Sequence, residues 1–185
     1  ACVKSNGQWK KTIKPRPPQI DEWTHFLHGP DNNSVARDTE IDFPEHLQWI
    51  GDPDHSRSHQ FQTSISTMVS SGGRLFYIMD EGSRVSILLP SHFALTARDA
   101  FNGTVLWRKE IGRWQTYLWP LKSGPTQLAR RLVSDGDRIF VTLAIDAPVS
   151  QLDGATGASL RVYESTKGAE EILHVDGVLY VLVNP

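Results

Sequence analysis

Three stretches of the chain share one order of polar and apolar positions: an apolar run, a turn with glycine, and a second, denser apolar run. They cover residues 65–79, 132–143 and 172–183. The second run in each is short, rich in β-branched and aromatic residues and bounded by turn residues, which is typical of a strand buried on both faces. The pattern therefore predicts three antiparallel hairpins with tight glycine turns.

A second pattern follows the first two of these hairpins. Residues 95–107 are echoed by residues 149–160, with an aspartate followed four residues later by glycine in both copies. In this arrangement the aspartate caps the turn backbone and the glycine takes a positive φ. The echo predicts one more hairpin per unit, and hence units of four short antiparallel strands.

The spacing of the units matches a known architecture. Gly136 and Gly177 are 41 residues apart, which is the length of one four-stranded propeller blade, whereas Gly72 and Gly136 are 64 apart. The longer first unit carries insertions at residues 81–92 and 113–127. We therefore predict an all-β chain of four-stranded propeller blades that does not contain a whole ring.

The segment Asp-Ala-Phe-Asn-Gly-Thr-Val-Leu-Trp, residues 99–107, resembles the A-x-D-x-x-T-G-x-x-x-W repeat of pyrroloquinoline quinone (PQQ)-like β-propellers. That family includes quinoprotein dehydrogenases and non-enzymatic assembly factors of bacteria. The resemblance implies structural roles in the repeat for Trp9, Asp99, Gly103, Trp107, Asp153 and Gly157. The second copy has Arg161 where Trp107 would fall, so a tryptophan contact is lost there.

The resemblance also suggests how the chain is divided. Residues 1–14 share W-(K/R)-K-x-I with the end of the first unit and are expected to be the last strand of a preceding blade. Residues 15–22 form a proline-rich connector. Residues 23–185 hold about two full blades and a truncated third, and they open on a segment in which Trp23 and Phe26 are expected anchors. We therefore expect a fragment of a longer protein.

Composition narrows the classes of partner. The formal net charge is −2 and the pI about 6.4, so no global basic field favours nucleic acid or an anionic membrane surface. No apolar run approaches the roughly 20 residues that a transmembrane helix needs. The single cysteine, Cys2, says nothing of the compartment; a periplasmic or other extracytoplasmic location is suggested by the resemblance alone.

Two groups of residues are candidates for binding chemistry. Asp54, His55 and His59 lie in a polar stretch and are of metal-ligand type, although their spacing matches no established metal motif and a solvated loop explains them as well. A quinone would need cations for its carboxylates and an aromatic ring for stacking. The residues of those types are Arg130, Arg131, Trp114 and Trp119; the two tryptophans could equally cover the edges of neighbouring blades.

The leading hypothesis is a rigid, non-catalytic scaffold within a larger bacterial-type protein, which presents blade loops to a protein partner or a small ligand. No catalytic residue is assigned. A first alternative is part of a quinoprotein dehydrogenase that oxidises an alcohol or a sugar, with PQQ and calcium bound only in the complete propeller. A second is a regulatory propeller fused to another enzyme domain, such as a methyltransferase.

Overall fold

The structure is a computed structural model that describes residues 2–11, 15–40, 45–52, 65–86, 88–114 and 128–184. The described residues form twelve strands and two short 3-10 helices, so the fold is all-β, as the sequence predicts. No helix among them is long and apolar enough to cross a membrane.

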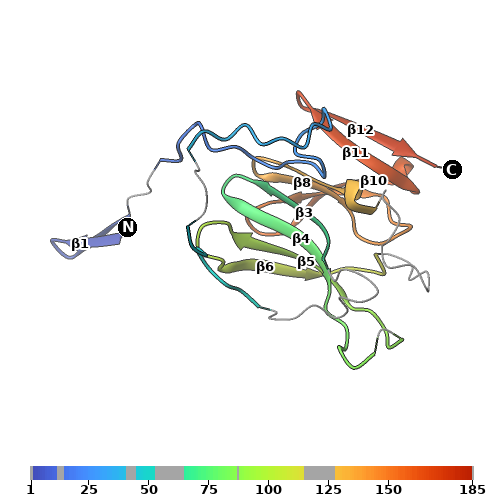
Figure 1. Cartoon of the computed structure of the whole chain (residues 1–185), viewed down its shortest axis with the longest axis horizontal. Coiled ribbons are helices and arrows are strands. Elements are labelled where there is room, and N and C mark those ends of the chain that lie inside the picture. The colour runs from blue at the N-terminus through green and yellow to red at the C-terminus, as the bar shows by residue number, and fades with distance from the viewer. Residues whose placement is uncertain are drawn as a thin grey trace.

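The first complete sheet is an antiparallel meander in the order β3-β4-β5-β6 (Figure 1). Its strands are β3 (Ile65–Ser71), β4 (Arg74–Asp80), β5 (Phe93–Asp99) and β6 (Val105–Glu110). Gly72 and Gly73 both have positive φ at the first turn, which a side chain would disfavour. Both hairpins predicted for this unit are confirmed.

The second sheet repeats this meander in the order β7-β8-β9-β10. Its strands are β7 (Leu132–Asp135), β8 (Arg138–Thr142), β9 (Val149–Asp153) and β10 (Ser159–Tyr163). The 3-10 helix η1 (Leu128–Arg131) leads into β7, and η2 (Glu164–Thr166) follows β10. The two hairpins predicted here are confirmed as well.

Two further hairpins complete the described chain. The third predicted hairpin consists of β11 (Ala169–Val175) and β12 (Val178–Val183), which follow the second sheet. At the other end, β1 (Cys2–Ser5) and β2 (Gln8–Lys11) form a small hairpin that extends away from the sheets in Figure 1. The two complete sheets are thus four-stranded and antiparallel, and the described strands do not close into a ring.

Neighbouring sheets are stacked face to face, and equivalent positions of the repeat fill each interface. Phe76 and Leu95 of the first sheet lie in the core shared with the second sheet. Their counterparts Phe140 and Val149 lie in the core between the second sheet and the last hairpin. The first strands of the three units also lie next to one another, because β3 contacts β7 and β7 contacts β11.

Candidate binding surfaces

The two D-x-x-x-G turns have the same geometry. The Asp99 carboxylate accepts backbone N–H bonds from Phe101 at 2.9 Å and Asn102 at 3.1 Å. The Asp153 carboxylate accepts the equivalent bonds from Ala155 and Thr156 at 3.0 and 2.8 Å. Gly103 and Gly157 have φ of 73° and 72°. The carboxylate and the glycine together set the shape of each turn.

A tryptophan docks on the second of these turns. Trp107, on β6, donates its indole N–H to the carbonyl oxygen of Gly154 at 2.9 Å. Its ring lies so close to Gly157 that a Cβ at this glycine would be only 2.8 Å from the ring. Lys109, two residues further along β6, donates to the Gly157 carbonyl at 3.2 Å. The last strand of the first sheet is thereby fastened to the second sheet.

The turn after Asp99 is covered by Trp49, which lies outside the predicted hairpins. Trp49 donates its indole N–H to Ala100 O at 2.9 Å, and a Cβ at Gly103 would collide with its ring. Ala100 and Gly103 lie 54 residues before Gly154 and Gly157, so the two dockings are equivalent. Trp9, for which the resemblance implies a structural role in the repeat, is 71% exposed on the β1–β2 hairpin.

One segment near the start of the chain crosses the first strands of all three units. The carbonyl of Trp23 accepts a bond from Ser70 N of β3 at 2.7 Å, and that of Thr24 accepts one from Ser134 N of β7 at 2.9 Å. The His25 ring accepts a bond from the backbone N–H of His174 of β11 at 3.2 Å. The anchor of this segment is therefore its backbone and His25, whereas Phe26, an expected anchor, is partly exposed.

Buried histidines surround this crossing. His25 Nε2 accepts the bond from His174, so its proton lies on Nδ1, which faces Thr24 Oγ1 at 2.8 Å. Burial, together with the nearby charge of His174, lowers the pKa of His25 to about 4. His174 stacks on Phe140 and lies 2.9 Å from the Asp135 carboxylate. Periodicity gave no signal for this cluster, because its members come from distant parts of the chain.

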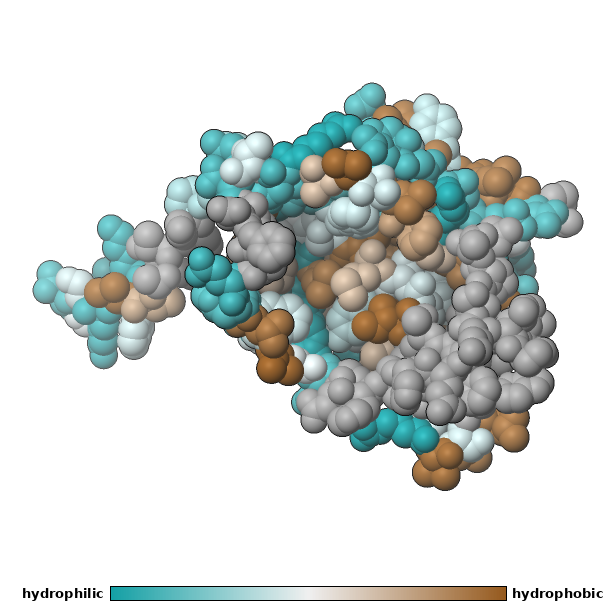
Figure 2. All heavy atoms as spheres, in the orientation of Figure 1, coloured by the Kyte–Doolittle hydropathy of each residue, from teal (hydrophilic) through white to brown (hydrophobic). Residues whose placement is uncertain are grey.

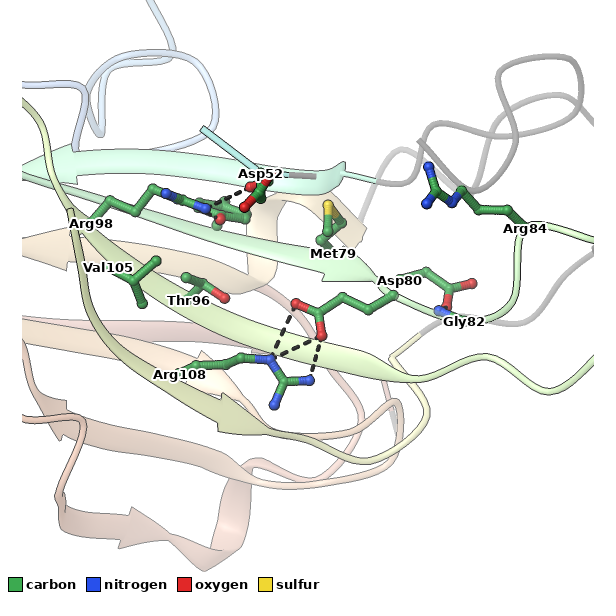
Figure 3. Close-up of a pocket in the computed structure, with 11 residues that line it drawn as sticks. Asp52, Met79, Asp80, Gly82, Arg84, Thr96, Arg98, Val105 and Arg108 are labelled. Carbon is green, nitrogen blue, oxygen red and sulfur yellow. Dashed lines mark hydrogen bonds and ion pairs between the residues drawn. The ribbon is translucent and has the colours of Figure 1, made fainter. Parts of the chain in front are cut away.

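A cleft of about 330 Å³ opens on the face of the first sheet that points away from the second (Figure 3). Tyr77, Met79 and Val105 give it an apolar lining, and in Figure 2 apolar side chains show in a hollow where Figure 1 places β4 and β5. Arg84 reaches it from the loop after β4 and forms no ion pair with a described residue. The cleft has room for side chains of a packed sheet or for a small organic molecule.

Two other arginines of this cleft are already engaged. Arg98 is only 9% exposed, and its guanidinium donates to three neutral oxygens: Tyr77 Oη, Gly103 O and Asp52 O. Arg108 forms an ion pair with Glu81, and this hydrogen-bonded pair raises the pKa of Arg108. Arg98 thus ties the backbone near Asp52 to the first turn, a role that the sequence did not indicate.

The described residues suggested for a quinone are engaged in contacts within the fold. Arg130 forms an ion pair with Glu171 of β11, and Arg131 donates to Ile145 O at 3.0 Å. Burial lowers the pKa of Arg131. Trp114 is 0% exposed within the core between the two complete sheets, so neither ring face is open to solvent. Trp119 lies outside the described residues.

The proposed metal ligands Asp54, His55 and His59 also lie outside the described residues. Within the part of the chain that the structure describes, no three His, Cys, Asp or Glu side chains are grouped to hold a metal ion. Comparison with known proteins adds no identity, because no protein-family model and no curated protein matches the chain.

Proposed function

We propose that this chain is part of a β-propeller of the PQQ-like repeat type, which acts as a rigid, non-catalytic scaffold and presents its loops to a protein partner or a small ligand. One observation carries the proposal: residues 23–25 bind the first strands of three successive units side by side. In a propeller, the first strands of successive blades line a common centre. A segment that bonds to all three fits that arrangement.

The contacts between units support the same proposal. Each complete sheet uses equivalent residues to cover the next one, and a tryptophan locks each described D-x-x-x-G turn. In repeat proteins generally, the stability that such interfaces contribute adds up from each unit to the next. Rigid units of short strands leave the connecting loops free to vary and to carry the binding function.

The loop at residues 81–92, between β4 and β5, is the best described candidate for such contacts. Val85 and Leu88 are almost fully exposed there, and Arg84 extends from the same loop over the cleft. By contrast, Arg130, Arg131 and Trp114 are engaged in contacts within the fold, which supports a scaffold more than a quinone site.

Negative-stain electron microscopy of the full-length protein tests the architecture. We expect ring-shaped particles with a central depression, and an open, elongated stack of sheets would overturn the propeller.

A titration with PQQ and calcium, followed by absorbance and by dye-coupled alcohol oxidation, tests the non-catalytic role. We expect neither stoichiometric binding nor turnover. Binding with turnover would replace the scaffold with a quinoprotein dehydrogenase.

A further inference from the structure

Trp49 and Trp107 occupy equivalent places on two successive units. Each indole donates to the carbonyl of the residue after the turn aspartate, and each ring covers the turn glycine. A neighbouring side chain adds a second bond in both cases: Gln48 donates to Phe101 O at 2.7 Å, and Lys109 donates to Gly157 O. The segment around Trp49 therefore binds the first sheet as β6 binds the second.

The two segments differ in what holds their backbones. β6 is the fourth strand of its sheet and is paired along its length with β5. Residues 45–52 form no strand, and no backbone–backbone hydrogen bond joins them to another described residue. Leu47 and Ile50, on either side of Trp49, are 78% and 79% exposed. An unpaired backbone with exposed apolar side chains is a template for pairing with another strand.

Among the described residues, no sheet covers the outer face of the first sheet in the way that the first sheet covers the second. Ile139 and Val141 of β8 are fully buried under the first sheet. Their equivalents in β4 are Leu75 and Tyr77, and Tyr77, which is 6% exposed, lines the cleft on the outer face. A sheet that covered these two residues would lie on the side from which Trp49 binds the turn after Asp99.

We infer that residues 47–51 are the fourth, outer strand of a further antiparallel sheet, whose edge strand pairs with them and whose face packs over the cleft on β3–β6. This inference rests on the proposed propeller, in which that sheet is the blade that closes the ring. It gives residues 47–51 the place that the sequence pattern suggested for residues 1–14. The partner of residues 47–51 is thus the edge strand of a sheet whose apolar face covers the cleft.

Hydrogen–deuterium exchange of the full-length protein tests this strand. We expect the amides of residues 47–51 to be protected to a degree comparable with those of β6. Fast exchange at residues 47–51 while β6 stays protected would overturn the inference and leave the propeller standing. An open stack in electron micrographs would overturn the propeller instead, so the two failures are distinguishable.

A pair of variants shows whether Trp49 positions the strand. Trp49→Phe removes the bond to Ala100 O and should speed exchange at residues 47–51 by about fivefold, the effect of one hydrogen bond. Trp9→Phe is the matched control and should leave that exchange unchanged. If Trp9→Phe speeds exchange at residues 47–51 and Trp49→Phe does not, the assignment of the strand is wrong.

Discussion

Gly157 offers a direct measure of how strongly one sheet is locked to the next. Replacing it with alanine does two things: it forces a side chain to a φ of 72°, and it places a Cβ 2.8 Å from the Trp107 ring. The left-handed backbone conformation costs a residue with a side chain roughly 1–2 kcal/mol. Overfilling a packed contact costs about 1–3 kcal/mol more. We therefore expect Gly157→Ala to lower the free energy of unfolding by about 2–5 kcal/mol.

Gly177 separates the two contributions. It has a similar φ of 78°, but an added Cβ would meet nothing within 4 Å. Gly177→Ala should therefore cost only the backbone part, about 1–2 kcal/mol. The difference between the two variants is the energy of crowding the docked indole. For a chain of this size, an extra 2 kcal/mol corresponds to a melting temperature lower by about 4–8 °C.

Urea titrations followed by circular dichroism would give these values, and a double-mutant cycle with Trp107→Ala would assign the crowding to the ring. In the Trp107→Ala background, Gly157→Ala should cost no more than Gly177→Ala does. The reasoning is refuted if Gly157→Ala and Gly177→Ala are equally destabilising in the original chain, or if the extra cost persists without the indole.

Three further outcomes are expected. As the pH falls from 6.5 to 4, His25 should lower the free energy of unfolding by about 3 kcal/mol, because the unfolded chain takes up a proton that the buried neutral ring excludes. Denaturant titrations should show this loss in the original chain and not in the His25→Gln variant. Equal pH dependence of the two proteins would contradict the prediction. In calorimetry, Trp49→Phe should lower the free energy of unfolding by about 1 kcal/mol and Trp9→Phe by under about 0.5 kcal/mol. Equal effects of the two variants would refute the docking of Trp49. Trp114→Ala should cost about 3–5 kcal/mol in the same measurement, and a loss under about 1 kcal/mol would be incompatible with its place in the core.

The strands could be predicted because they depend on local chemistry. Dense apolar runs, β-branched residues and glycine turns mark β4, β8 and β12 in the sequence itself. The echo of Asp99 in Asp153 likewise follows from turn geometry that each segment determines alone. Such signals are read within a dozen residues and do not need tertiary contacts.

The sites could not be predicted in the same way. Residues 23–25 carry no strand pattern and are held by a few hydrogen bonds to strands far along the chain. Trp49 left one usable signal: it lies 51 residues before its acceptor Ala100, close to the 47 that separate Trp107 from Gly154. A tryptophan about one unit before a D-x-x-x-G turn is therefore the sequence signal for this docking.

The bond between His25 and His174 also has a consequence for biosynthesis. Its partners are 149 residues apart, so at ribosomal rates of about 5–20 residues per second the acceptor is exposed for roughly 7–30 s before its donor is made. During that time the first and second sheets can fold from short-range contacts alone. Residues 23–25 can therefore bind the first strands of all three units only after the third hairpin has emerged from the ribosome.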